Sequence, residues 1–379
     1  MDSSDLDNIS FLLSGARDAK FAQRPIPKLS PYDVLVAVKK TGICGSDVHF
    51  YSEGKMVDNV VTTPFSLGHE SAGVISKVGE EVKNVKVGDR VAMEPGESCY
   101  RCEDCKAGRY QFCEFCEFAS NHPVDGTLQR YFKLPTDMVY KLPDNITLEE
   151  GALVEPLSVA VHTVSTLAQL RANQKVAVFG AGPIGLACMA VSRALGASRI
   201  IAIDIVPSRL EFAKGYVGAD TFLPPRVEDG ESKVQYSRRV VKLMSSTLGI
   251  EERGVNGIDL VVDATGAETC AQMAIFLAKE GGKFIQVGFG AQEVILPITL
   301  LLTKELTVRG SWRYGPGDYE LAIALIASGK VDMKPLVTHR FKFQDAIDAF
   351  EATRKGMSED GRSVIKTIIS GPDVLPEEH

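Results

Sequence analysis

Four cysteines that lie close together in the sequence form the clearest metal-binding pattern. Cys99, Cys102, Cys105 and Cys113 fall in one stretch rich in Cys, Glu and Gly. Four thiolates at such spacing suit tetrahedral Zn²⁺, and a closed four-sulfur site leaves no position for a substrate. The pattern therefore predicts a structural zinc that staples a loop with little hydrophobic content. Cys116 is an alternative fourth ligand, and a set of reduced free thiols is the alternative to a metal site.

Three more metal-ligand types occur outside that stretch. Cys44 stands in Gly42-Ile43-Cys44-Gly45-Ser46-Asp47, and His69 and Glu70 stand together in a second Gly-flanked segment. Each residue alone is more often structural than catalytic. Together they offer a thiolate, an imidazole and a carboxylate, and three protein ligands with one open position describe a catalytic zinc site.

A glycine-rich turn predicts dinucleotide binding. The run Gly180-Ala181-Gly182-Pro183-Ile184-Gly185 follows the apolar segment 176–179 and precedes a segment that reads as a helix. In such a strand–turn–helix the glycines permit a tight turn and close approach of a pyrophosphate to the helix N-terminus. The next strand ends at Asp204, whose carboxylate can accept hydrogen bonds from a ribose and would repel a 2′-phosphate. NAD is therefore expected rather than NADP, although Arg209 could soften that repulsion.

Composition and charge exclude several classes of protein. The chain has 379 residues, 45% hydrophobic and 24% charged, with a formal net charge of −7. A net negative charge argues against nucleic acid as the main partner. No apolar run reaches the roughly 18 residues of a membrane span, so no membrane partner is expected. The segment 1–7 is acidic and has no apolar core, which argues against a secretory signal and makes the cytoplasm the expected location.

The order of patterns predicts an α/β protein with two domains. Short alternating segments near residues 33–38 and 73–91 indicate antiparallel strands, and from about residue 175 to 290 apolar strands alternate with helices, which is typical of a parallel sheet. We expect a β-rich catalytic domain at 1–160 and 301–379, with a doubly wound dinucleotide-binding domain inserted at 161–300. Within the polar region 224–256, one amphipathic helix is expected at 238–248.

Longer motifs resemble a known family. The run Gly68-His69-Glu70-x2-Gly73-x5-Gly79-x2-Val82 is similar to the signature of the zinc-containing alcohol dehydrogenases, which belong to the medium-chain dehydrogenase/reductase superfamily. Segments 42–49, 155–162, 179–185 and 310–314 resemble its polyol dehydrogenase branch, which holds sorbitol, xylitol and L-arabinitol dehydrogenases. Segments 304–310 and 315–319 look most like the fungal xylitol dehydrogenases.

The resemblance implies a fold and a set of roles. The fold is a GroES-like catalytic domain with a Rossmann-type cofactor domain. Cys44, His69 and Glu70 would hold the catalytic zinc, with Glu155 reaching it directly or through water and Ser46 passing on a proton. The substrate pocket would be lined by Tyr51, Phe118, Arg313 and Tyr314. Cofactor contacts beyond Gly180, Gly182, Pro183 and Gly185 would come from Ile184, Asp204, Arg209, Val287, Gly288, Phe289, Ser311 and Trp312.

These observations predict an NAD-dependent enzyme that contains one catalytic and one structural zinc. It would transfer a hydride between a polyol secondary alcohol and NAD, with xylitol and D-xylulose as the preferred pair and sorbitol (L-iditol) or L-arabinitol as alternatives. A non-catalytic NAD-binding sensor and a zinc-free quinone reductase are the other hypotheses, and the metal-ligand residues argue against both. The resemblance also implies a homo-oligomer, either a dimer or a tetramer.

Overall fold

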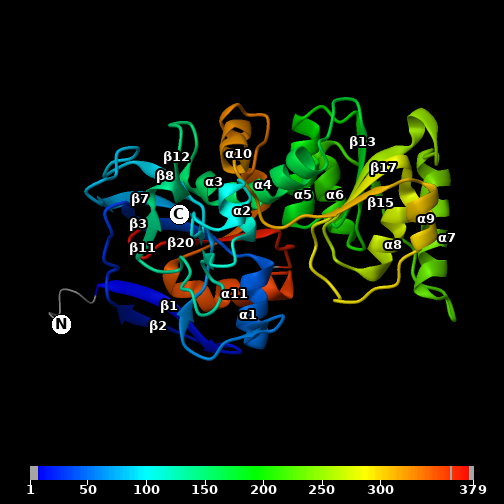
Figure 1. Ribbon diagram of the computed structural model, residues 1–379. Coiled ribbons are helices and arrows are strands. Elements are labelled where there is room, and N and C mark those ends of the chain that lie inside the picture. The colour runs from blue at the N-terminus through cyan, green and yellow to red at the C-terminus, as the bar shows by residue number, and fades with distance from the viewer. Residues whose placement is uncertain (1–6, 359–360, 375–379) are drawn as a thin grey trace. The chain divides into compact units, whose positions relative to one another are not determined.

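A computed structural model describes residues 7–358 and 361–374. The expectation that the segment 1–7 is not a secretory signal concerns residues that mostly lie outside these ranges. The chain divides into two compact units, Met1–Glu155 with Gly315–His379 and Pro156–Tyr314. The second unit is therefore inserted into the first along the chain, and its residues run from green to orange in Figure 1. The predicted range 161–300 falls inside the second unit, whereas the domain boundaries themselves stay a prediction.

The first unit is rich in antiparallel β structure, as the alternating segments predict. Its largest sheet has seven strands in the order β12-β8-β7-β3-β20-β19, with β11 paired to β3 off that path. A three-stranded sheet, β2-β1-β6, accompanies it. The strands of this unit are β1 Asn8–Gly15, β2 Asp18–Arg24, β3 Asp33–Gly42, β4 Lys55–Met56, β5 Asn59–Val60, β6 Phe65–Ser66, β7 Glu70–Val78, β8 Arg90–Met93, β9 Gly96–Glu97, β10 Glu117–Phe118, β11 Tyr131–Pro135, β12 Val139–Lys141, β19 Val337–Phe341 and β20 Lys366–Ser370.

The helices of the first unit are few and short. They are α1 Gly45–Glu53, α2 Glu103–Lys106, α3 Leu148–Ala152, α10 Asp318–Ala327 and α11 Ala346–Lys355, and α4 Val154–Val161 begins at the end of this unit and continues into the second. A buried cluster that includes Phe11, Phe50, Phe65, Tyr51 and Phe350 joins α1 and α11 to the small sheet. This apolar packing fixes α1, which carries the residues that follow Cys44.

The second unit is a doubly wound parallel sheet of six strands. Their order is β15-β14-β13-β16-β17-β18, and every pairing is parallel. Between β13 and β16 the strand order switches from one side of the sheet to the other, and open α/β sheets bind ligands at such a switch point. The elements are β13 Lys175–Phe179, α5 Pro183–Ala194, β14 Arg199–Ile203, α6 Pro207–Val217, β15 Asp220–Phe222, α7 Lys233–Leu248, β16 Ile258–Asp263, α8 Glu268–Leu277, β17 Ala278–Gln286, α9 Ile298–Thr303 and β18 Thr307–Gly310.

Helix α7 is longer than its expected range of 238–248. It begins at Lys233, because the Ser232 hydroxyl accepts from the Gln235 N–H while the Gln235 side chain accepts from the Ser232 N–H. Such a reciprocal capping box satisfies free N–H groups of the first turn. One face of α7, which includes Tyr236, Val240 and Met244, belongs to the buried core of the sheet.

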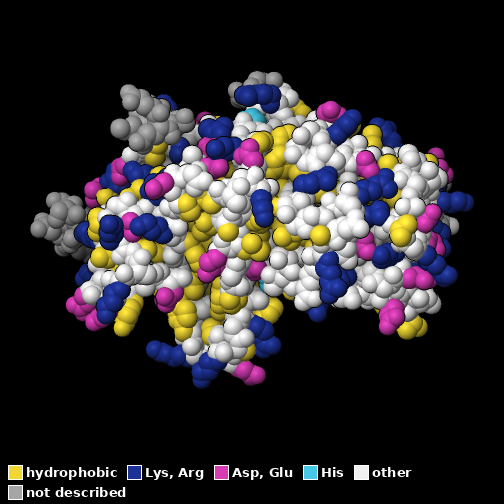
Figure 2. Space-filling view, turned by 90° about the horizontal axis from the view of Figure 1, so that it is seen from above, with side chains coloured by type: hydrophobic (Ala, Val, Ile, Leu, Met, Phe, Trp, Pro, Cys, Tyr) yellow, Lys and Arg dark blue, Asp and Glu magenta, His cyan; other side chains and the backbone are white. Residues whose placement is uncertain are grey.

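Charged side chains of both signs are scattered over the face of the molecule shown in Figure 2. Within the described residues, no helix combines the length and apolar character needed to cross a membrane.

Candidate metal centre and cofactor site

The structure brings Cys44, His69 and Glu70 together. One ligand atom from each lies within 4.8 Å of the others. Cys44 directly precedes α1, while His69 and Glu70 stand at the start of β7. Strand pairing explains the meeting, because β3 pairs with β7 so that Gly42 lies opposite Glu70. The chemistry of this donor set, with one thiolate, one imidazole and one carboxylate, fits a zinc ion with an open position.

Asp47 orients His69. Its Oδ1 lies 3.2 Å from His69 Nδ1, which turns the other ring nitrogen, Nε2, away from Asp47 and leaves it for a metal. The same carboxylate accepts from the Ser120 hydroxyl at 2.6 Å and, through Oδ2, from the Cys44 N–H at 3.2 Å. Burial opposes the charge on Asp47, yet His69 and these donors hold its pKa below the usual value. Burial also opposes a charge on His69, and Asp47 with Cys44 nevertheless raises its pKa well above 6.5.

Sequence reasoning did not single out Asp47, although a signal was present. Asp47 stands three residues after Cys44, and the Asp47 carboxylate accepts from the Cys44 backbone, as in a capping box. Cys44 is thus the N-cap residue of α1. Ser46 lies in the first turn of α1 and is half-buried. Its proton-transfer role stays a prediction.

Lys366 is a second residue that sequence reasoning missed. Its Nζ donates to both carboxylate oxygens of Glu70 at 2.7 Å and to the Ile43 carbonyl at 3.1 Å. Both side chains of this ion pair are buried, with 3% and 1% exposed. Burial disfavours a charged lysine, but Glu70, Cys44 and Glu155 outweigh it and raise the pKa of Lys366. Glu155 is buried and its charge acts on Lys366, yet within the described residues it is not a member of the three-residue cluster.

Two of the expected pocket residues have defined positions in the first unit. The Phe118 ring lies 5.6 Å from the His69 ring, so it flanks the metal cluster. Tyr51 packs its ring 5.1 Å from that of Phe350 in the buried core. Burial and the nearby charge of Glu351 raise the pKa of the Tyr51 phenol. The pocket roles of both residues stay predictions.

The second metal pattern also folds into a cluster. Sulfur atoms of Cys99, Cys102, Cys105 and Cys113 lie within 4.8 Å of one another, and Cys116 is not in this set. Backbone N–H groups of Arg101 and Cys102 donate to Cys99 Sγ and lower the pKa of that thiol to about 6. This geometry favours Cys113 as the fourth ligand, and four converging sulfurs fit a closed zinc site.

The glycine turn has the geometry that a pyrophosphate requires. Gly180 adopts a φ of 92°, which side chains rarely tolerate, and Gly185 approaches its carbonyl so closely that a Cβ there would lie 1.8 Å from that oxygen. A Cβ at Gly182 would meet nothing within 4 Å, so protein atoms leave that side of the turn open. Pro183 and Ile184 then begin α5 and are half-buried. The turn thus presents a helix N-terminus behind an uncovered backbone, which fits a dinucleotide.

Asp204 follows β14 and is tied to this turn. Its Oδ2 accepts from the Ala181 N–H at 2.7 Å and its Oδ1 from the Val206 N–H at 2.8 Å. A carboxylate has further lone pairs, so these bonds fix its orientation and still allow a ribose hydroxyl to donate to it. Arg209 lies half-buried on α6, a few residues beyond Asp204.

The remaining expected cofactor contacts cluster after β17 and β18. Val287, Gly288 and Phe289 follow β17, and the Phe289 ring lies 5.8 Å from that of Trp312. Ser311 donates its backbone N–H to Gln286 O, and its hydroxyl lies 2.9 Å from that of Thr163. Of the two pocket residues expected here, Arg313 lies over the Trp312 ring and Tyr314 is buried. Their roles toward cofactor and substrate stay predictions.

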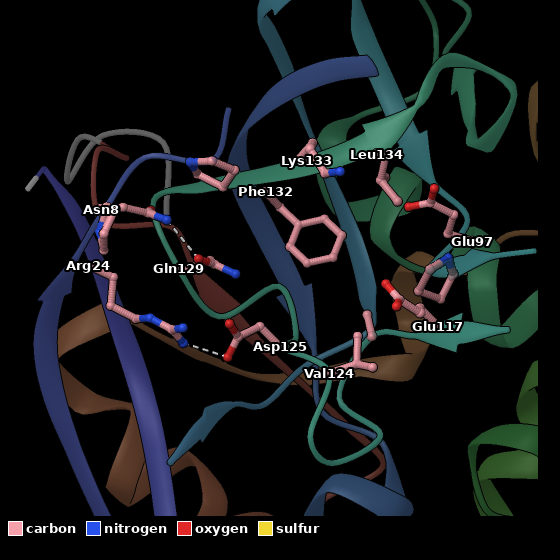
Figure 3. A pocket seen from close by; sticks show the side chains of 14 residues that line it. Asn8, Arg24, Glu97, Glu117, Val124, Asp125, Gln129, Phe132, Lys133 and Leu134 are labelled. Carbon is pink, nitrogen blue, oxygen red and sulfur yellow. Dashed lines mark hydrogen bonds and ion pairs between the residues drawn. The ribbon is translucent and has the colours of Figure 1, made fainter. Parts of the chain in front are cut away.

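A separate cavity of about 390 Å³ opens in the first unit, shown in Figure 3. Phe132 lines it together with Glu97 and Glu117, which are directly opposite one another across β9 and β10. Its lining includes no member of either metal cluster.

Comparison with known proteins shows the family to which the chain belongs. Residues 30–144 match the alcohol dehydrogenase GroES-like domain, and residues 183–328 match the zinc-binding dehydrogenase domain. Together with the relatives described next, these matches show that the chain belongs to the zinc-containing alcohol dehydrogenase family. The predicted family and the predicted combination of a GroES-like domain with a Rossmann domain are thereby confirmed.

Within this family the chain is similar to named sugar-alcohol enzymes. It is 50% identical over 368 residues to D-xylulose reductase A of Aspergillus oryzae, which covers 97% of this chain and 98% of the relative. It is 48% identical over 367 residues to D-xylulose reductase A of Aspergillus niger, with 97% of each chain covered. Among solved structures, 2R,3R-butanediol dehydrogenase from Bacillus subtilis aligns with a TM-score of 0.82 at 29% identity, covering 96% of this chain and 99% of the other.

Proposed function

We propose that this protein is an NAD- and zinc-dependent polyol dehydrogenase that interconverts xylitol and D-xylulose. The observation that carries the proposal is the convergence of Cys44, His69 and Glu70, with Asp47 behind His69, in a chain about half identical to D-xylulose reductases. A sensor protein would be free to lose these ligands. A zinc-free quinone reductase would have no use for either metal cluster.

Each residue of the first unit at the metal centre has a separate proposed role. A zinc ion held by Cys44, His69 and Glu70 would polarise the substrate oxygen as a Lewis acid, and NAD would accept the hydride. Asp47 lies beside Nδ1 of His69 and would orient the imidazole so that Nε2 is the nitrogen offered to the metal. Phe118 covers one side of His69 with an apolar ring and limits access of water from that side. Ser46 accepts the proton of the substrate hydroxyl while it releases its own proton outward to solvent, and Glu155 adds negative charge near Lys366.

The turn at 180–185 and Asp204 hold the cofactor in the second unit. The backbone N–H groups at the start of α5 receive the pyrophosphate, and Asp204 receives the ribose hydroxyls. In this unit Val287, Gly288, Phe289, Ser311 and Trp312 are the proposed contacts of the nicotinamide end, and Arg313 and Tyr314 are proposed polyol contacts. A simple alkanol lacks the additional hydroxyls of a polyol, so the polar side chains of the pocket would be left without hydrogen-bond partners. We therefore expect a simple alkanol to be a poor substrate.

A substrate panel tests the proposal. Purified protein with zinc counted per chain is assayed by NADH formation on xylitol, sorbitol, L-arabinitol and ethanol, with NAD and with NADP. We expect xylitol with NAD to give the highest kcat/KM, and Cys44→Ser to abolish turnover while the buried Cys188→Ala leaves it intact. Highest activity on sorbitol or L-arabinitol would reassign the substrate. A zinc-loaded Cys44 site with no activity on any polyol would overturn the function.

We further propose that the chain forms a homo-oligomer and works in the cytoplasm. Strand β18 is the edge of the six-stranded sheet and all of its residues are exposed. Large apolar side chains are exposed in the segment around it, with Ile298 at 68% and Leu302 at 79%. An open strand edge beside exposed apolar side chains is a natural pairing surface, and a second copy of the chain is the occupant that we propose. Light scattering tests the assembly, and cell fractionation tests the location.

A further inference from the structure

Strand β20 carries a buried lysine, Lys366, that contacts Glu70 of the metal cluster. All five residues of β20 are buried, and the strand pairs antiparallel with β3 so that Ile368 lies opposite Gly42. In Figure 1 this strand, in red, lies among the blue strands of the first unit. Lys366 stands at its first position, and its ammonium uses all three donors, two on Glu70 and one on the Ile43 carbonyl.

The site is built around this pair. A Cβ at position 42 would lie 2.2 Å from Glu70 Oε2, so glycine is required there for the carboxylate to lie against β3. Both Glu70 oxygens are held at equal distances of 2.7 Å by one ammonium. Charge-assisted bonds of this length are strong, and in a buried environment they compete with any other cation for the same oxygens.

We propose that Lys366 is a positioning residue that weakens the hold of Glu70 on the catalytic metal and thereby keeps that ligand exchangeable. This inference rests on the proposed zinc centre. When the metal is absent, Lys366 is the main cation that neutralises the buried Glu70. When the metal is bound, the carboxylate is shared between two cations. Lys366 therefore stabilises the metal-free protein more than the metal-bound protein, and its removal must strengthen metal binding.

The direction of this effect separates positioning from a merely structural role. If Lys366 only supported the fold, a Lys366→Met variant would loosen the site and release its metal faster. The proposal expects the opposite, because an unpaired buried carboxylate raises the free energy of the metal-free state. Partners in the outer shell of metal sites change affinity by about 10- to 100-fold, and we expect a change of that size here.

The experiment measures transfer of zinc from the loaded protein to a coloured chelator. A Cys113→Ser background removes the four-cysteine site, so that only the Cys44 site reports. We expect Lys366→Met to release zinc about 10-fold or more slowly than the background protein, and to show a larger rise in Tm on adding zinc. Lys366→Arg, which keeps the charge, should restore the release rate. Lys366→Met combined with Glu70→Gln should lose the slow release, because neither charge remains.

Each outcome decides the question. Faster or unchanged release from Lys366→Met in a protein that binds zinc and oxidises xylitol would overturn this inference alone. Failure of the unmodified protein to hold zinc at Cys44 would overturn the proposed function itself. If Lys366→Met does not fold without zinc, it is purified loaded. Its release rate is then compared with that of the double variant, and equal rates would reject the proposal.

Discussion

Glu94 gives a pH dependence that can be worked out from the structure. It follows β8, is 1% exposed, and its Oε2 accepts from the Tyr140 hydroxyl at 2.7 Å. Burial raises the pKa of Glu94 from 4.5 to about 7, although the hydroxyls of Tyr140 and Tyr110 favour its charged form. The carboxylates of Asp318 and Glu320 add to the increase.

The sign follows from proton linkage. Between pH 4.5 and 7 the folded protein keeps the proton on Glu94 while the unfolded chain has released it, so the folded state binds more protons. The free energy of unfolding therefore falls as pH rises through this window. Above pH 7 the folded protein bears the whole loss of stability that comes from ionising the buried Glu94. A shift of that size corresponds to about 3 kcal/mol at 1.36 kcal/mol per pKa unit.

Glu94→Gln removes this cost and keeps an oxygen that can accept from Tyr140. We expect the variant to match the unmodified protein at pH 4.5 and to have a Tm several degrees higher at pH 8. Thermal unfolding of zinc-loaded protein followed across this pH range is the assay. Glu80→Gln, at an exposed position of the same unit, serves as the control and should leave the profile unchanged. A constant Tm difference at every pH would refute the reasoning, because a pH-independent effect cannot come from this carboxyl group.

Three further predictions concern the cofactor, the structural metal and assembly. Asp204→Ala should lower the preference for NAD over NADP in kcat/KM by about 10- to 100-fold, the size of a lost charged hydrogen bond, whereas the exposed Glu211→Ala should not. Cys113→Ser should lower the zinc content by one ion per chain and lower the Tm, while Cys116→Ser leaves both unchanged, and the reverse would make Cys116 the ligand. Val308→Lys, on the exposed edge strand, should reduce the mass measured by light scattering to that of a smaller assembly, and an unchanged mass would remove β18 from the interface.

The four-cysteine pattern and the glycine turn are predictable from sequence because their residues are close together in the chain. The four cysteines of 99–113 lie within one loop, and Gly180 to Gly185 form a single turn, so sequence distance and spatial distance nearly coincide there. The start of α7 has an equally local signal, because Ser232 and Gln235 make a capping box that places the first helical residue at Lys233. Asp47 belongs to the same class of local signals.

Lys366 could not be predicted in the same way. It follows Val364 and Ile365 and precedes Thr367 and Ile368. A lysine inside such a continuous apolar run predicts a strand buried on both faces and therefore a buried cation that needs an anion.

The identity of that anion depends on the register of β20 against β3 and of β3 against β7, which joins residues 296 positions apart in the chain. The sequence thus predicts that the charge of Lys366 must be neutralised, but only the strand pairing shows that the neutralising group is Glu70. Since Glu70 is also the proposed carboxylate ligand, the same pairing couples the C-terminal strand to the electrostatics of the metal centre.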